Sequence, residues 1–238
     1  MRHRFASRRS AAWSCRMPRR LRALALVLGA LVPILATAGE WPDTPLARTE
    51  ALALLQTLNA DLLGHPSATL TLERWCGSHQ LATRPTVVAR RDRTASKPLP
   101  EDLRRALGID AGTPVRYRRV QLACGDHVLS EADNWYLPGR LTAAMNQALD
   151  HSDTPFGKVV APLHFHRHTL SARLLWSPLP SGWDMHGLPA AGKQPLVLPH
   201  QLLQHRALLE DAQGHPFSAL VETYTEQVLA FPPPTARE

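Results

Sequence analysis

The stretch from Arg116 to Pro138, RYRRVQLACGDHVLSEADNWYLP, most constrains how this chain folds. Its β-favouring residues are interrupted at Gly125 and then resume, which predicts a strand, a tight turn and a second strand. The first arm holds three arginines, Arg116, Arg118 and Arg119. Because successive strand side chains point to opposite faces, Arg118 and Arg119 lie on different faces. If one face packs on a core, one of these two guanidiniums enters it and needs an anion there, since an unpaired buried charge is costly.

The N-terminal segment predicts a secretory signal peptide rather than part of the fold. Residues 1–22 hold eight arginines and no acid, residues 23–35 are apolar, and Ala36-Thr37-Ala38 resembles a cleavage site before Gly39. Met17 is an alternative start that gives a leader of more ordinary length. The apolar run is short for a membrane span, although an uncleaved membrane anchor stays an alternative. We therefore expect a periplasmic or secreted bacterial protein.

Removal of the leader changes the charge of the chain. Without its eight arginines, the 27 basic residues fall to 19 against 20 acidic residues, a net charge of −1. A mature surface of this charge does not predict nucleic-acid binding. The chain also lacks a C-x-x-C pair, a phosphate-binding P-loop and a G-x-G-x-x-G motif, so we expect no cofactor. After cleavage we expect no stable membrane insertion.

The remaining length of about 200 residues suits one domain with its own core. We expect residues 1–38 to be the signal peptide, residues 39–230 to form a single domain, and the proline-rich residues 231–238 to be a disordered tail. We also expect a monomer. The mature chain keeps Cys76 and Cys124, which either pair in an oxidising compartment or stay buried as separate thiols.

Hydrophobic spacing along the mature chain predicts both helices and strands. Helices are expected over 44–63, after an N-cap at Ser67, before Gly108, over 141–149 and after the turn at 152–157. Strands are expected at 86–90, in the central hairpin, at 163–175 and in a second hairpin over 204–228, with a long loop over 177–200. Hairpins with helices between them predict an α+β fold, with an antiparallel β-sheet and helices packed on one face.

The second hairpin carries an acid in an apolar setting. Leu220, Glu222 and Tyr224 fall on one face of the last strand, and Val221 and Thr223 fall on the other. A half-buried carboxylate near a guanidinium is a candidate general acid, because burial raises the pKa of such a group and a cation lowers it. The alternative is a structural Arg–Glu pair across the sheet.

Three histidines alternate in the predicted strand over 163–175, namely His164, His166 and His168. Neutral imidazole is a good metal ligand, but neighbours in such a row stand roughly 7 Å apart because a strand rises about 3.3 Å per residue. One metal ion does not easily reach all three. We therefore interpret the row as a solvated face and expect no metal.

From Arg116 onward the chain resembles the bacterial chorismate lyase family. The central hairpin is similar to that family's strand–turn–strand, and Thr154-Pro155-Phe156-Gly157 resembles its T-P-[LF]-G turn. The stretch GHPFSALVETY resembles the closing hairpin of the family, so that the resemblance covers roughly residues 116–226. It implies a chorismate lyase-like fold and the elimination of pyruvate from chorismate, or a related enol ether, to give 4-hydroxybenzoate.

The resemblance also implies site residues. The family's substrate-binding arginine falls on Arg119 and its catalytic carboxylate on Glu222, while backbone groups that hold the aromatic product fall on Ala68 and Phe156. Arg119 would then bind a substrate carboxylate and Glu222 would act at the departing ether oxygen. We accordingly expect Arg119 to face inward beside Glu222, and Arg118 to lie in solvent or on a rim.

Two functions are compatible with these expectations. The first is an exported lyase of the chorismate lyase type. The second is a non-catalytic periplasmic binding or accessory protein for a small aromatic carboxylate, because the same fold serves as the ligand-sensing domain of some bacterial transcription regulators. The predicted leader argues against a regulator.

We predict that export removes the leader at or near Gly39. The order of a basic region, an apolar region and a small-residue cleavage site is the pattern that signal peptidases process. N-terminal sequencing of the protein from a bacterial host checks this, and a cytoplasmic protein that still begins at Met1 or Met17 would contradict it.

Overall fold

The structure, a computed structural model, describes residues 40–234, which all belong to one compact unit. The predicted signal peptide and the last four residues of the predicted tail lie outside the described residues. The described helices are α1 (Pro45–Gly64), α2 (Ala68–Ser78), α3 (Glu101–Leu107), α4 (Ala143–His151), α5 (Phe156–Val159) and α6 (Trp183–His186). Three short 3-10 turns are η1 (Pro138–Arg140), η2 (Ala161–Leu163) and η3 (Glu226–Leu229).

The strands form one antiparallel sheet with the order β1-β2-β3-β6-β5-β4. Their bounds are β1 (Val87–Asp92), β2 (Arg116–Cys124), β3 (His127–Tyr136), β4 (His166–Leu174), β5 (Gln201–Glu210) and β6 (Pro216–Thr225). The two predicted hairpins are β2–β3 and β5–β6, and they pair with each other through β3 and β6. The predicted α+β class is confirmed.

Local sequence explains where the helices begin and end. The Thr44 side chain caps α1 by accepting a hydrogen bond from the Ala47 N–H, and the Ser67 side chain caps α2 by accepting one from the Leu70 N–H. Helix α3 ends at Gly108, whose φ of 64° is left-handed and suits glycine. The predicted helix starts and stops are therefore confirmed at these three places.

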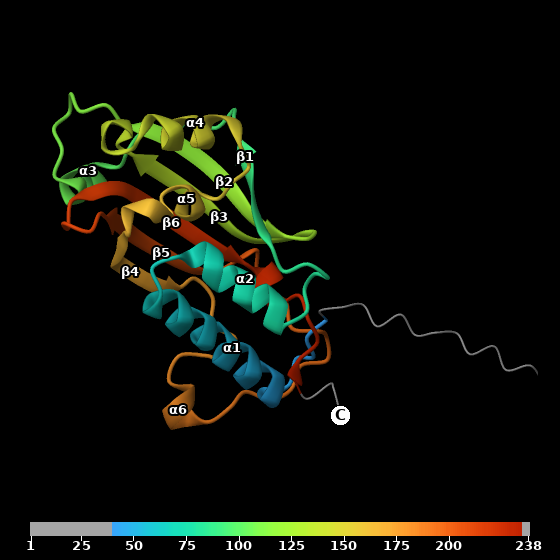
Figure 1. Cartoon of the computed structure of the whole chain (residues 1–238). Coiled ribbons are helices and arrows are strands. Elements are labelled where there is room, and N and C mark those ends of the chain that lie inside the picture. The colour runs from blue at the N-terminus through green and yellow to red at the C-terminus, as the bar shows by residue number, and fades with distance from the viewer. Residues whose placement is uncertain (1–39, 235–238) are drawn as a thin grey trace, which may run out of the picture. The chain divides into compact units, whose positions relative to one another are not determined.

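Most of the helices cover one face of the sheet (Figure 1). Helices α1 and α2 bury apolar side chains, among them Leu55 and Leu72, against β1, β2, β3, β5 and β6. Helices α4 and α5 pack beside them on the same face, against β5 and β6. Helix α3 is an exception to the predicted arrangement, because Leu103 and Leu107 pack with Trp135 on the opposite face.

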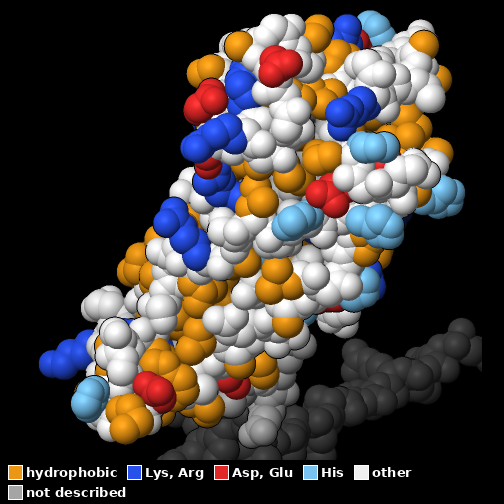
Figure 2. All heavy atoms as spheres, turned by 90° about the vertical axis from the view of Figure 1, so that its left-hand side faces the viewer, with side chains coloured by type: hydrophobic (Ala, Val, Ile, Leu, Met, Phe, Trp, Pro, Cys, Tyr) orange, Lys and Arg blue, Asp and Glu red, His pale blue; other side chains and the backbone are white. Residues whose placement is uncertain are grey.

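The surface of the domain mixes charges of both signs. In Figure 2, basic side chains on one face are interspersed with acidic side chains and histidines. Within residues 40–234, no helix has both the length and the apolar character that a bilayer crossing requires.

The predicted tail begins with a buried residue, since Phe231 is 4% exposed and stacks on His79 with ring centroids 4.3 Å apart.

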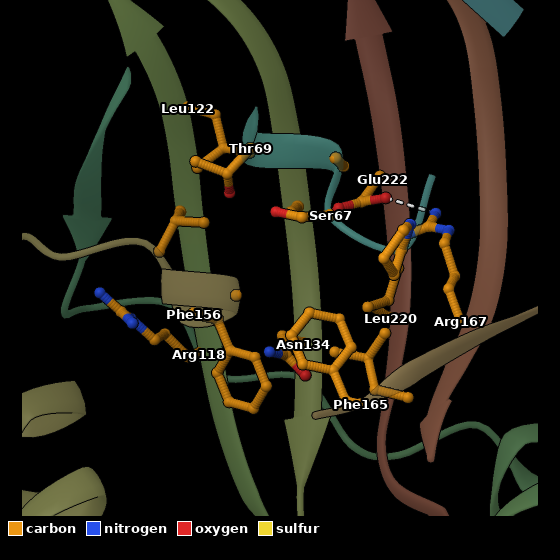
Figure 3. Close-up of a pocket in the computed structure, with 16 residues that line it drawn as sticks. Ser67, Thr69, Arg118, Leu122, Asn134, Phe156, Phe165, Arg167, Leu220 and Glu222 are labelled. Atoms are coloured by element: carbon orange, nitrogen blue, oxygen red, sulfur yellow. Dashed lines mark hydrogen bonds and ion pairs between the residues drawn. The ribbon is translucent and has the colours of Figure 1, made fainter. Parts of the chain in front are cut away.

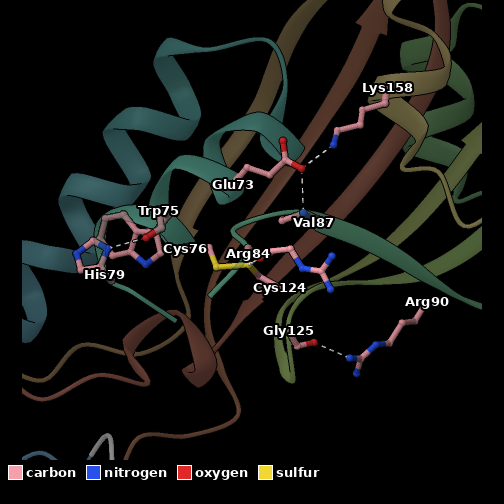
Figure 4. Close-up of a disulfide and its surroundings, with 10 residues drawn as sticks. All are labelled: Glu73, Trp75, Cys76, His79, Arg84, Val87, Arg90, Cys124, Gly125 and Lys158. Carbon is pink, nitrogen blue, oxygen red and sulfur yellow. Dashed lines mark hydrogen bonds and ion pairs between the residues drawn. A yellow bond between two sulfur atoms is a disulfide. The ribbon is translucent and has the colours of Figure 1, made fainter. Parts of the chain in front are cut away.

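A disulfide joins Cys76 of α2 to Cys124 at the end of β2 (Figure 4). The sequence left open whether these cysteines pair, and the structure pairs them. Glu73, also on α2, accepts a hydrogen bond from the Val87 N–H at 2.9 Å. Helix α2 is therefore fixed to the sheet at β1 and β2, independently of the apolar side chains that it buries.

Loss of this disulfide should lower the free energy of unfolding by about 2–4 kcal/mol, because the crosslink restricts the unfolded chain. Urea unfolding of the oxidised protein, the reduced protein and the Cys76→Ala/Cys124→Ala variant measures this. The reduced protein and the variant should unfold at the same, lower urea concentration. Coincidence of all three curves would contradict a stabilising disulfide.

Candidate functional site

A small cavity opens on the helix-covered face of the sheet, where α2 begins and α5 lies over β2, β3 and β6 (Figure 3). Its free volume is about 50 Å³, several times the roughly 10–15 Å³ that one water molecule needs. The space suits a small molecule rather than a polymer. The polar residues that line it are Ser67, Thr69, Arg118, Asn134, Arg167 and Glu222.

The sheet places Arg118, not Arg119, in this cavity. Arg118 is 2% exposed, and it shares its face with Val120 and Leu122, which belong to the core under α1 and α2. The predicted inward position of Arg119 beside Glu222 is wrong, and so is the predicted exposure of Arg118. The reason is strand alternation. Val120 and Leu122 are buried, and every second residue of β2 faces the same side, so Arg118 faces inward and Arg119 does not.

Arg119 lies on the opposite face in an ion-pair network of its own. Its side chain is 35% exposed and contacts Glu131 at 3.2 Å and Asp133 at 3.1 Å. Lys97 and the Tyr117 hydroxyl also bind Asp133, at 2.7 and 2.6 Å. Burial alone would raise the pKa of Asp133, but these donors lower it. Arg119 is therefore already neutralised and belongs to a structural network.

Glu222 lines the cavity as predicted, and it forms a buried ion pair. The Arg167 Nη2 donates to Glu222 Oε2 at 2.6 Å, and the two side chains are 4% and 9% exposed. The Tyr224 hydroxyl donates to the same oxygen at 3.2 Å. In Figure 3 the second carboxylate oxygen of Glu222 points toward Ser67, on the cavity side. The alternative of an Arg–Glu pair across the sheet is thus present, with Arg167 as the partner.

Within residues 40–234, Arg118 forms no such ion pair, and Asp153 acts on its charge only at longer range. Its Nη2 donates to the carbonyl oxygens of Ser152 and Thr154, at 3.4 and 3.2 Å. The Nε and Nη1 atoms are buried and have no acceptor within residues 40–234. Burial and then repulsion by Arg91 lower the pKa of Arg118 to about 10, so the side chain stays charged at pH 7. In Figure 3 its guanidinium points away from the Glu222–Arg167 pair.

The other two residues implied by the family resemblance also line the cavity. Ala68 is the first residue of α2, and Phe156 is the first residue of α5. A helix N-terminus carries a partial positive charge and N–H groups without helical partners. Ser67 and Thr69, the sequence neighbours of Ala68, also line the cavity, and Figure 3 shows both hydroxyls.

Sequence reasoning missed Arg118, Arg167, Asn134 and Phe165 as cavity residues. The sequence does contain a signal for Arg167. If His166 and His168 face solvent, strand alternation turns the residue between them inward. Its pairing with Glu222 depends on the sheet order, because β5 lies between β4 and β6.

The predicted histidine row is shorter than expected. His166 and His168 are exposed on β4, but His164 precedes the strand in a left-handed conformation with a φ of 48°. Within residues 40–234, no group of His, Cys, Asp or Glu side chains is arranged to hold a metal ion.

Beside Glu222, at the paired position of β5, lies a buried neutral histidine, His205. Its Nε2 is 2.8 Å from Asn59 Oδ1, and its Nδ1 has no partner among the described residues. Burial and then repulsion by Arg167 lower the pKa of His205 to about 4. An unfolded histidine titrates near pH 6.5, so between these values the unfolded chain binds a proton that the folded protein does not.

We predict that His205 makes the fold acid-sensitive. Its contribution to stability is complete above about pH 6.5 and is lost as the pH falls toward 4, by on the order of 3 kcal/mol. The difference in unfolding free energy between pH 7 and pH 4.5 should shrink in His205→Gln. The same difference should persist in His168→Gln, whose site is exposed. An unchanged pH dependence in a folded His205→Gln protein contradicts the assignment.

One curated protein shares most of its length with this chain. It is y4mC from Sinorhizobium fredii (strain NBRC 101917 / NGR234), described as an uncharacterized protein. The two are 53% identical over 202 residues, which cover 84% of this chain and 85% of y4mC. No family model matches the chain.

Solved structures resemble the fold only in part. YydK from Bacillus subtilis subsp. subtilis str. 168 has a TM-score of 0.37 and 15% identity, over 58% of this chain and 57% of YydK. PhnF from Mycobacterium smegmatis has a TM-score of 0.42 and 14% identity, over 68% and 65% of the two chains. A GntR-family transcriptional regulator from Enterococcus faecalis V583 has a TM-score of 0.35 and 14% identity, over 57% and 91%. The chain spans less than two thirds of YydK and PhnF, and at these scores the likeness carries no conclusion about activity.

These findings correct the family suggested by the sequence motifs. Assignment to the chorismate lyase family is wrong, because no family model matches the chain and the relative that shows its family is y4mC. The physical reason is that the three motifs are a hairpin, a turn and a second hairpin. Such motifs specify strand pairing and turn geometry, which proteins of different activity share.

Proposed function

The chain belongs to the family of y4mC, and we propose that it binds a small aromatic carboxylate in the cavity beside Arg118. The observation that supports this most is the charge of Arg118. Arg118 is 2% exposed, two of its guanidinium nitrogens lack acceptors, and none of the acidic side chains of residues 40–234 forms an ion pair with it, so its charge is costly to bury. A bound anion supplies the missing counter-charge.

The charges around the cavity favour an anion rather than a cation. Two cationic residues, Arg118 and Arg167, and one anionic residue, Glu222, line it, which leaves a net charge of +1. Because Glu222 neutralises Arg167, the excess charge belongs to Arg118. The N-terminus of α2 adds a partial positive charge to the same wall. A planar carboxylate also matches the forked donors of a guanidinium.

The rest of the wall favours an apolar ring. Val120, Leu122 and Leu220 line the cavity. Phe156 and Phe165 lie together on one side of it (Figure 3). Aromatic side chains contact ring-shaped ligands favourably in offset or edge-to-face arrangements. A single ring that carries one carboxylate therefore suits the chemistry of the site.

Glu222 supports binding in this proposal rather than turnover. One of its oxygens already accepts hydrogen bonds from Arg167 and Tyr224. The other faces the cavity and is available to accept a hydrogen bond from a ligand. We accordingly propose the non-catalytic alternative, a binding or accessory protein.

We predict that Arg118→Met removes ligand binding without loss of stability. Truncating one side of a buried charge pair weakens binding by about 2–5 kcal/mol. Without ligand, replacement of an unpaired buried charge by an apolar side chain of similar size should keep or raise stability. Calorimetric titration with 4-hydroxybenzoate measures the affinity, and thermal unfolding measures the stability. The uncharged analogue 4-hydroxybenzyl alcohol should bind poorly to the unmodified protein.

Arg119→Met is the matched control, because it removes the neighbouring arginine on the opposite face. It should leave the affinity for 4-hydroxybenzoate unchanged while destabilising the network of Asp133. The reverse pattern, in which Arg119→Met removes binding and Arg118→Met does not, contradicts the proposed site. Absence of binding by the unmodified protein contradicts the proposed ligand class.

We also propose that the protein acts outside the cytoplasm. The predicted leader supports this, and so does the Cys76–Cys124 disulfide, because disulfides persist mainly in oxidising compartments. Detection of the processed chain in a periplasmic fraction, with Cys76 and Cys124 oxidised, tests export and disulfide formation together.

A further inference from the structure

The segment of residues 152–165, between α4 and β4, closes one side of the cavity. It contributes Phe156, Gly157 and Phe165 to the cavity wall. Its regular structure is limited to α5, which has four residues, and η2, which has three. Helix α5 has no side-chain cap at its N-terminus. So short a helix has little stability of its own and depends on the contacts that it makes.

Helix α5 lies directly on the N-terminus of α2. A Cβ atom built on Gly157 would stand 3.4 Å from Ser67 Oγ and 3.9 Å from Thr69 Oγ1. These are ordinary van der Waals distances, so α5 lies against the polar rim of the cavity. With α5 in this position, the cavity is covered at the place where α2 presents its first residues.

An ion pair holds α5 to α2 at this contact. Lys158 Nζ donates to Glu73 Oε1 at 2.5 Å, and the two side chains are 33% and 19% exposed (Figure 4). The same Glu73 oxygen accepts the Val87 N–H, and Cys76 of α2 is bonded to β2. Glu73 is thus a fixed anchor on the sheet side, whereas Lys158 belongs to the short segment.

The segment also seals Arg118. The carbonyl oxygens of Ser152 and Thr154 accept hydrogen bonds from its Nη2. Their lengths of 3.4 and 3.2 Å lie at or beyond the long end of the usual range for N–H···O bonds. The Nε and Nη1 atoms are buried without acceptors. At the other end of the segment, His164 ends η2 in the left-handed conformation, with a φ of 48°. Displacement of the segment would expose Arg118 to an anion.

We propose that residues 152–165 form a lid that opens to admit the ligand to Arg118, and that the Glu73–Lys158 ion pair is the latch that keeps it closed. This inference rests on the proposed function for the identity of the ligand, but the lid itself is testable without any ligand. The latch is present in the closed protein with and without ligand. It therefore governs the rates of binding and release rather than the affinity.

The first test is hydrogen–deuterium exchange on the ligand-free protein. The reporters are the amides of Val159 and Val160, which donate to Pro155 and Phe156 within α5. Lys158→Met removes the charge but keeps most of the alkyl chain, and it should speed exchange at these amides about two- to fivefold, the effect of losing a partly exposed ion pair. Lys158→Arg keeps the charge and should restore slow exchange.

The matched control is Arg74→Met, which breaks the pair between Arg74 and Asp61 at 3.0 Å, on α2 and α1. This pair also joins two helices at the surface but does not involve α5. It should leave exchange at Val159 and Val160 unchanged. Equal exchange in Lys158→Met and the unmodified protein overturns the latch, whatever the ligand.

The second test is stopped-flow binding of 4-hydroxybenzoate. In Lys158→Met the association and dissociation rates should both rise, about two- to fivefold, while Kd stays within about twofold. A Kd that rises with an unchanged association rate overturns the gate and makes Lys158 a contributor to affinity. If the unmodified protein binds no 4-hydroxybenzoate while Lys158→Met exchanges faster, the proposed ligand class fails and the latch stands.

Discussion

The buried guanidinium of Arg118 is the constraint on which the proposed site depends. An arginine in an apolar interior needs either an acid or a polar environment, and in the described residues Arg118 has only two carbonyl oxygens at long hydrogen-bond distances. The neighbouring Arg91 adds more to the positive potential at Arg118 than the carboxylate of Asp153 removes. The contrast with Arg167 is informative, because that side chain is buried on the same face with Glu222 as its counter-ion. One end of the cavity is therefore neutralised and the other is not.

The position of α2 connects this electrostatic feature to the fold. The helix begins at the cavity rim, is anchored by Glu73 to β1, and is bonded through Cys76 to β2. These links set the distance between the helix N-terminus and the strand that carries Arg118. They also give the short helix α5 a fixed surface to close against. The disulfide, the cavity and the proposed lid are thus parts of one arrangement around α2.

Much of this structure could be predicted from the sequence, because it depends on local periodicity. Capping residues, glycine and proline locate most helices and both hairpins, and Val120 and Leu122 already assign Arg118 to the inward phase of β2. Using a short-motif resemblance to choose Arg119 gave the wrong face, because motif alignment does not measure burial. The Arg167–Glu222 pair, the disulfide and the contact of α5 with α2 could not be predicted, since each joins segments whose proximity depends on sheet order and helix docking.

A crystal structure of the protein with 4-hydroxybenzoate tests the central claim most directly. The ring should lie against Phe156 and Phe165, with a carboxylate oxygen within about 3.2 Å of an Arg118 nitrogen. The hydroxyl group of the ligand should point toward the Glu222 oxygen that does not bind Arg167. A ligand in the reverse orientation, with its carboxylate at Arg167, or a ligand bound on the face of Arg119, would contradict the account.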